Sequence, residues 1–241
     1  MLFDKLSSMS VKETTQNKTI EDLFSVGAHF GYSKSRRHPS VKNFIYGIKK
    51  KSEIFDLERT AESLFEALEF VSKLTGEGGV VLFIGGKKES HDAIRDGAMS
   101  VKMPYVSGRW IGGTITNFEE IKKRIERLET LREEKTRGDH QKYTKKEQLL
   151  LEREINKLED YFGGLTTMRE LPKAILVVDP KREKIAVDEA KRKGIKIIAL
   201  AGSDCDISEI DYPIPANDSS KKSIEYFVGQ IVEAIKESKK S

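Results

Sequence analysis

The residues best suited to binding chemistry lie between positions 29 and 52. This segment, HFGYSKSRRHPSVKNFIYGIKKKS, contains seven Lys or Arg residues and two histidines but no acid, although 39 of the 241 residues in the chain are acidic. Aromatic residues are interleaved with the basic ones. Basic side chains neutralise phosphates and aromatic faces stack on unpaired bases, so the pattern indicates an RNA-binding surface. The alternative is a solvated basic loop whose aromatic side chains pack into the core.

A second candidate is FIGGKKES at 83–90, which places two glycines and two lysines at an expected strand-to-helix turn. Phosphates bind at such turns in α/β proteins, and a lysine there could equally meet an RNA phosphate. The stretch matches neither GxxxxGK[ST] nor GxGxxG, and neither pattern occurs elsewhere in the chain. Together with Asp179, at the end of an expected strand, it could serve a nucleotide or sugar-phosphate enzyme. The alternative is an ordinary tight turn.

Residue sets typical of catalysis or metal binding are sparse. The four histidines show neither HxxxH nor HExxH spacing; they are His29, His38, His91 and His140. Cys205 stands between two aspartates, whose charges would raise the pKa of its thiol and weaken it as a nucleophile. The sequence therefore assigns no catalytic residue, no metal ligands and no cofactor.

The composition limits the class of protein further. The net charge is only +4, because 43 Lys and Arg residues offset the 39 acids, so the local distribution of charge matters more than the sum. No apolar run approaches the roughly 20 residues needed to cross a bilayer. The first 19 residues lack the continuous apolar stretch of a secretory signal, and one cysteine cannot form an intramolecular disulfide. These features predict a soluble, cytoplasmic protein.

Strand-like and helix-like segments alternate in two parts of the chain. Continuous apolar runs typical of strands buried on both faces lie at 80–85, 173–180 and 195–201. Segments with helical spacing of apolar residues lie at about 58–74, 88–100, 182–193 and 219–238. The alternation predicts an α/β domain with a parallel sheet flanked by helices, formed by residues 19–116 and 164–238. A flexible arm is expected at residues 1–18.

The segment at 117–163 differs from both parts. Residues 117–162 carry twelve basic and twelve acidic residues, and their apolar residues recur at alternating spacings of three and four, as in a coiled-coil seam. A Gly-Asp-His break in the middle is followed by Thr144 and Glu147, the pattern of a capping box that restarts a helix. The segment is therefore expected to form an antiparallel coiled-coil hairpin inserted into the α/β domain.

The junction SGRWIGGTITN at 107–117 leads into this hairpin. Its glycine pair allows a sharp turn, and Thr116 or Asn117 is expected to cap the first helix, with a following glutamate returning the bond. These roles do not explain why an arginine and a tryptophan stand at Arg109 and Trp110.

Several motifs together resemble one family. They are GAHFGY, RRHPSVKNFIYGIKKKSEIFDLERT, VVLFIGGKK, GRWIGGTITN, TKKE, FGGL, LPKAILVVDPKRE and DYPIPAND, in order from about residue 20 to about residue 235. The chain is thereby identified as a member of the bacterial-type family of small-subunit ribosomal protein two. It departs from the family at Tyr32, where a second histidine is usual, which weakens any metal site built on paired histidines.

The resemblance implies a flavodoxin-like α/β fold and a structural constituent of the small ribosomal subunit, located in the cytoplasm, that catalyses no reaction. It implies contacts with ribosomal RNA and neighbouring proteins, including the large OB-repeat ribosomal protein that captures messenger RNA, with no membrane and no homo-oligomer. The candidate RNA-binding residues are His29, Phe30, Tyr32, Lys34, Arg36, Arg37, Lys42, Lys49, Lys50, Lys87, Arg109 and Trp110. The rivals are the phosphate-binding enzyme described above and a coiled-coil scaffold that binds no nucleic acid.

Overall fold

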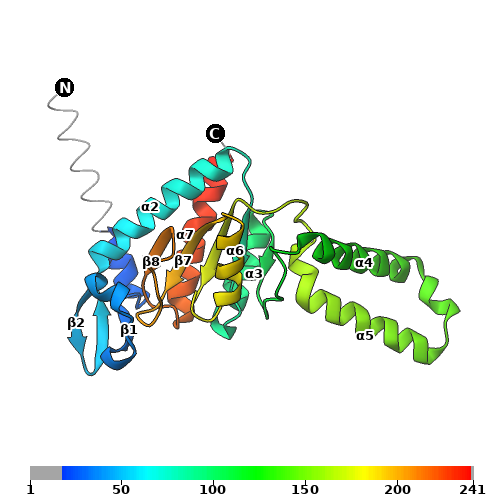
Figure 1. The fold of residues 1–241 in the computed structure, drawn as a ribbon, viewed down its shortest axis with the longest axis horizontal. Coiled ribbons are helices and arrows are strands. Elements are labelled where there is room, and N and C mark those ends of the chain that lie inside the picture. The colour runs from blue at the N-terminus through cyan, green and yellow to red at the C-terminus, as the bar shows by residue number, and fades with distance from the viewer. Residues whose placement is uncertain (1–17, 240–241) are drawn as a thin grey trace.

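A five-stranded parallel sheet forms the centre of the computed structural model, which describes residues 18–239 (Figure 1). Its strands are β4 (Val81–Ile84), β5 (Tyr105–Val106), β6 (Ala174–Val178), β7 (Lys196–Ala201) and β8 (Tyr212–Pro215). They lie in the order β5-β4-β6-β7-β8. Counted along the chain, this is the flavodoxin-like order 2-1-3-4-5, with its switch point between β4 and β6. The predicted parallel sheet is confirmed.

Helices cover both faces of this sheet. They are α2 (Leu57–Gly76), α3 (His91–Ser100) and α7 (Lys221–Ser238) on one face and α6 (Lys184–Arg192) on the other. Successive side chains of β4 alternate between the two cores, with Phe83 in the cluster of the first face and Leu82 in that of the second. Both are buried, which explains why this strand reads as a continuous apolar run.

Two long helices project from the sheet between β5 and β6 (Figure 1). Helices α4 (Phe118–Arg137) and α5 (Lys145–Phe162) run in opposite directions, and each buries one apolar stripe. Cross-helix ion pairs join them, including Arg127 to Glu154 at 3.2 Å. The predicted capping box is confirmed, because the side chains of Thr144 and Glu147 bond each other's backbone N–H groups.

A second, smaller sheet precedes the main one. Its antiparallel strands β1 (Phe30–Ser33), β3 (Ser52–Phe55) and β2 (Ile45–Lys49) lie in that spatial order. Of these three, the sequence indicates only β3, because SEIFDL at 52–57 reads as a short strand. The segment between β1 and β2 forms two 3-10 turns, Lys34–Arg36 and Pro39–Phe44. The basic segment is therefore mostly ordered backbone rather than a loop.

Hydrogen bonds to Ser203 attach the small sheet beyond the carboxyl end of β7. The N–H of Tyr32 donates to Oγ of Ser203 at 2.9 Å, and the N–H of His38 donates to the carbonyl of Ser203 at 2.9 Å. Val41 and Phe55 pack there in an apolar cluster. Ser203 is fully buried, so the attachment is part of the core of the protein.

Residues 18–25 are helical, in agreement with the sequence, where Thr19 followed by Asp22 resembles the start of a short helix that runs to about Val26. The arm predicted for residues 1–18 lies, apart from its last residue, outside the described residues. Each helix of residues 18–239 is too short or too polar to cross a membrane.

Candidate nucleic-acid interface

The turn between β2 and β3 holds two lysines in an unfavourable backbone conformation. Lys49 pairs with Ser52, so only Lys50 and Lys51 lie between the strands, with φ of 48° and 71°. Two-residue turns with positive φ at both positions strongly favour Asn-Gly. A left-handed conformation costs a lysine roughly 1–2 kcal/mol. Backbone strain of this kind is typical of functional residues. It therefore indicates a binding role for the ammonium groups of Lys50 and Lys51.

Most cations of the small sheet have no anionic partner. Six exposed basic side chains make no ion pair with any residue in the described range 18–239; they are Lys34, Arg36, Lys42, Lys49, Lys50 and Lys51. By contrast, several cations of α4 are paired with glutamates, such as Arg127 with Glu154. A cluster of unpaired cations on ordered backbone creates a positive field that suits phosphates.

Other predicted residues of this segment shape the surface instead. Arg37 donates to Glu53 at 3.0 Å, and because the Glu53 carboxylate is fully buried, this pair anchors the segment to β3. The ring of His29 lies between Phe24 and Phe30, with centroids 4.5 and 4.0 Å away. Burial, followed by the charge of a nearby lysine, lowers the pKa of His29, so this ring is neutral at pH 7.

Tyr32 and Arg36 contact each other across the edge of the segment. The guanidinium of Arg36 lies over the Tyr32 ring at 5.2 Å, and the Tyr32 hydroxyl lies 2.6 Å from Oγ of Ser219. The tyrosine thus holds the arginine in place while leaving its charge exposed.

Lys87 is not part of this surface, which corrects the sequence prediction. Its ammonium lies 2.7 Å from Asp179 and 2.8 Å from Asp218, and the side chain is buried. Burial alone lowers the pKa of Lys87, but the two carboxylates outweigh it and raise the pKa above its usual value. The charge of Lys87 is neutralised inside the protein by these two carboxylates, so the geometry disfavours a phosphate contact by Lys87.

The glycine-lysine turn offers no open phosphate cradle. The N–H of Gly86 donates to Oε1 of Glu183 at 3.2 Å, and a Cβ at Gly86 would come within 2.5 Å of that oxygen. With Lys87 also paired, protein carboxylates occupy the place at the switch point where a nucleotide phosphate would bind. Asp179 is the partner of this lysine and adopts φ of 62°. The geometry disfavours the nucleotide-enzyme alternative.

Cys205 lies beside the same carboxylates. Burial raises the pKa of its thiol to about 12, and the charges of Asp218 and Asp179 add to the effect. The predicted rise is confirmed, although burial is the largest cause.

The junction before α4 is organised by one carboxylate, that of Glu189 on α6. Its oxygens accept hydrogen bonds from Trp110 Nε1 at 3.2 Å and from three backbone N–H groups, those of Gly113, Ile115 and Thr116, at 2.7–3.0 Å. The Thr116 hydroxyl donates a fifth bond at 3.0 Å. Burial alone raises the pKa of Glu189, but these bonds outweigh it and hold the pKa below its usual value.

This arrangement explains Trp110 and corrects two predictions. Trp110 is buried, so it braces the junction and does not face RNA. Thr116 does not cap α4, because its hydroxyl is bonded to Glu189. Asn117 occupies the N-cap position, as predicted, but its side chain makes no capping bond. Arg109 is exposed beside this junction. It follows β5, three strands from β7, so it lies roughly 14 Å along the carboxyl edge of the sheet from the attachment of the small sheet.

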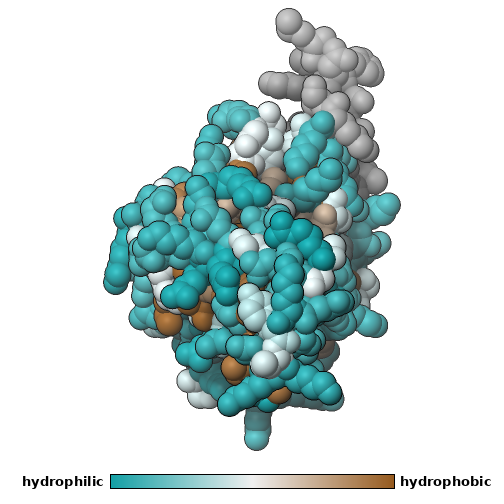
Figure 2. Space-filling view, turned by 90° about the vertical axis from the view of Figure 1, so that its right-hand side faces the viewer, coloured by the Kyte–Doolittle hydropathy of each residue, from teal (hydrophilic) through white to brown (hydrophobic). Residues whose placement is uncertain are grey.

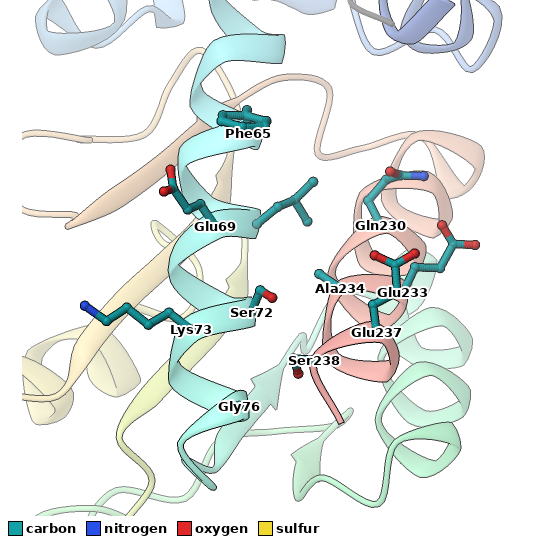
Figure 3. Close-up of a pocket in the computed structure, with 11 residues that line it drawn as sticks. Phe65, Glu69, Ser72, Lys73, Gly76, Gln230, Glu233, Ala234, Glu237 and Ser238 are labelled. Atoms are coloured by element: carbon teal, nitrogen blue, oxygen red, sulfur yellow. The ribbon is translucent and has the colours of Figure 1, made fainter. Parts of the chain in front are cut away.

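A groove of about 700 Å³ between α2 and α7 is lined by three glutamates and one lysine, Lys73 (Figure 3). Glu69 on α2 and Glu233 and Glu237 on α7 line it, and none is ion-paired within residues 18–239. Residues 57–77 contain five glutamates and two basic residues. An excess of acid disfavours phosphate binding at this groove.

We expect Lys87→Met to lower the free energy of unfolding by roughly 3–5 kcal/mol, because it leaves two buried carboxylates without a counter-charge. Lys88→Met, at the adjacent exposed position, should change it by less than about 0.5 kcal/mol. Urea unfolding followed by the fluorescence of Trp110, the single tryptophan, measures both. Equal stability of the two variants would contradict the buried ion pair.

We expect Glu189→Gln to cost roughly 2–4 kcal/mol at pH 7, because an amide NH₂ faces donors that the carboxylate oxygens had accepted. The exposed Glu233→Gln is the control. Because the folded-state pKa of Glu189 is depressed, its contribution is present above the usual value of 4.5 and is lost as the pH falls through the folded value. The stability difference between wild type and variant should therefore narrow below about pH 4.5; a constant difference from pH 7 to pH 3 would refute the role.

Comparison with known proteins gives a consistent result. The family model described as "Ribosomal protein S2" matches residues 23–238. The small ribosomal subunit protein uS2 of Helicobacter hepaticus is 42% identical over 219 residues, which cover 91% of this chain and 83% of that protein. The protein of the same name from Sulfurimonas denitrificans is 41% identical over 221 residues, covering 92% of this chain and 85% of the relative.

Proposed function

The chain belongs to the ribosomal protein S2 family, and on this premise we propose how it binds within the ribosome. As a member it is a structural constituent of the small ribosomal subunit, associates with ribosomal RNA and ribosomal proteins there, and is not an enzyme. The proposal concerns which surfaces make these contacts.

We assign the RNA contact to the small sheet. The observation that supports this most is the group of six exposed cations between Lys34 and Lys51, which stand on ordered backbone and are unpaired within residues 18–239. Arg36 is held over Tyr32 and the two turn lysines are held in strained conformations, so these charges are positioned before RNA arrives. Arg109 extends the same edge. Phe30 is half exposed beside the cations and supports the contact.

The projecting helices are assigned to a different partner. We propose that α4 and α5 form a coiled-coil hairpin, a unit of residues 117–163 inserted between the two parts of the α/β domain at 19–116 and 164–238. Figure 2 looks at the molecule from the side to which these helices project, and that surface is mostly hydrophilic with isolated apolar spots. Three exposed apolar or aromatic side chains lie on this hairpin; they are Tyr143, Leu149 and Leu150.

We propose that these side chains dock a neighbouring ribosomal protein, the large OB-repeat protein that captures messenger RNA, and that the chain acts as a single copy in each subunit. Exposed leucines amid paired charges form a small apolar anchor with a polar rim, the usual composition of a transient protein interface.

The turn lysines provide a test of the RNA contact that separates binding from folding. Lys50→Asn with Lys51→Gly should raise the free energy of unfolding by about 1 kcal/mol, because Asn-Gly suits this turn. The same change should weaken binding to small subunits depleted of their own copy, measured by co-sedimentation across a salt series. The salt slope should fall by about one unit for each phosphate that the variant no longer neutralises.

The matched control is Arg192→Gln with Lys193→Gln. It also removes two positive charges, but at the end of α6, near the amino-terminal edge of the sheet. Both positions are exposed and unpaired within the described part of the chain. This control should leave the slope unchanged. An identical loss of affinity in both variants would show a general effect of net charge and would sink the assignment to the small sheet.

The exposed leucines of α5 test the docking proposal. Leu149→Ser with Leu150→Ser should leave stability within about 0.5 kcal/mol of wild type, because both side chains are about half exposed. Subunits rebuilt with this variant should retain less of the OB-repeat protein after sedimentation than subunits rebuilt with the exposed control Arg153→Ser. Equal retention would contradict the docking role.

A further inference from the structure

Tyr46 is an aromatic side chain that the fold leaves without a partner. It is 82% exposed, and no ring, cation or hydrogen-bonding group of residues 18–239 is paired with it. The other aromatic residues of the basic segment are accounted for: Phe30 contacts His29, Tyr32 bonds Ser219, and Phe44 packs on the apolar cluster under the small sheet.

A β-bulge accounts for the direction of Tyr46. Ile45 pairs with Phe55 and Gly47 pairs with Ile54, so two steps along β2 correspond to one step along β3. Tyr46 is the extra residue at this irregularity. A bulge turns a side chain away from the regular alternation of the strand and often lies at a functional surface.

The space around Tyr46 is open. A Cβ built on the adjacent Gly47 would meet no atom within 4 Å, so nothing in the described part of the chain covers the backbone beside the ring. Strand β2 is an edge strand, bonded only to β3 among the described strands. A planar ligand can therefore approach the ring from outside the sheet.

The charge around the ring identifies the ligand class. Lys49 is three residues from Tyr46 along the strand, roughly 10 Å at the usual rise, and Lys50 and Lys51 follow it in the turn. The acid opposite Ile48 is Glu53, which is buried and paired with Arg37, so it adds no exposed negative charge. An aromatic face beside unpaired cations is the arrangement that binds an unpaired base and its flanking phosphates.

We propose that Tyr46 stacks on an unpaired base of the small-subunit ribosomal RNA while the lysines of the β2–β3 turn contact phosphates next to that base. This inference rests on the proposed RNA contact of the small sheet and adds a base to it. Stacking requires an unpaired base, so this contact depends on the RNA being single-stranded at that point. Contacts with phosphate alone do not depend on it.

The experiment compares Tyr46→Leu and Tyr46→Phe with wild type in the salt series on depleted small subunits. Tyr46→Leu should weaken binding about 5- to 150-fold, the range for losing one stacked base, and Tyr46→Phe should bind within about threefold of wild type. The salt slope should stay unchanged in both, because stacking releases no counterions. Phe65→Leu, at an exposed aromatic residue on the acidic face, is the matched control and should bind as wild type.

Chemical probing of RNA bases in the same subunits gives the second readout. One base protected by wild type and by Tyr46→Phe should become reactive with Tyr46→Leu. Loss of affinity without any change in base reactivity would show that Tyr46 contacts a protein, and equal weakening by Phe and Leu would show that the hydroxyl carries the contact; either result overturns the stacking proposal. Wild-type affinity of Tyr46→Leu would also overturn it. Failure of the wild type itself to bind would instead refute the proposed RNA contact.

Discussion

The architecture depends most on the hydrogen bonds that the carboxylate of Glu189 accepts. The connection between β5 and α4 has little secondary structure of its own, yet it sets the angle at which two long helices leave the sheet. Burying an anion is costly unless donors surround it, and here five donors from one short segment converge on two oxygens. Because α6 packs on the sheet and supplies that anion, the orientation of the projecting helices is tied to the core.

Burial also separates the charged side chains that are paired from those that are not. Where a cation has a structural task, as in Lys87, carboxylates surround it. On the small sheet, six cations have no anionic partner among residues 18–239. Of the acids next to this segment, Glu53 is buried and paired with Arg37, and Asp206 faces His38 at 3.6 Å. Three glutamates unpaired within the same range line the groove between α2 and α7. A net charge of +4 therefore conceals an uneven distribution, with the unpaired cations concentrated on the small sheet.

The sequence revealed the elements with strong periodicity and missed those fixed by distant partners. The parallel strands and the stripes of α4 and α5 follow from apolar spacing alone. The β2–β3 turn at Lys50 was missed because it lacks the Asn-Gly signal, and the burial of Lys87 was missed because Asp218 lies 131 residues away. Thr116 was misassigned as a cap for the same reason, since Glu189 is 73 residues distant. The basic segment itself was visible, because the absence of acids is a property of composition.

The edge position of β2 has a consequence for the protein before it reaches its partner. A free edge strand exposes unpaired backbone groups to which another chain can add, and newly made protein passes through the cell with that edge uncovered. The bulge at Tyr46 interrupts the regular ladder, and the three consecutive lysines at the end of the strand repel a second copy brought alongside. Features that suit RNA thus also protect the unassembled chain from aggregation.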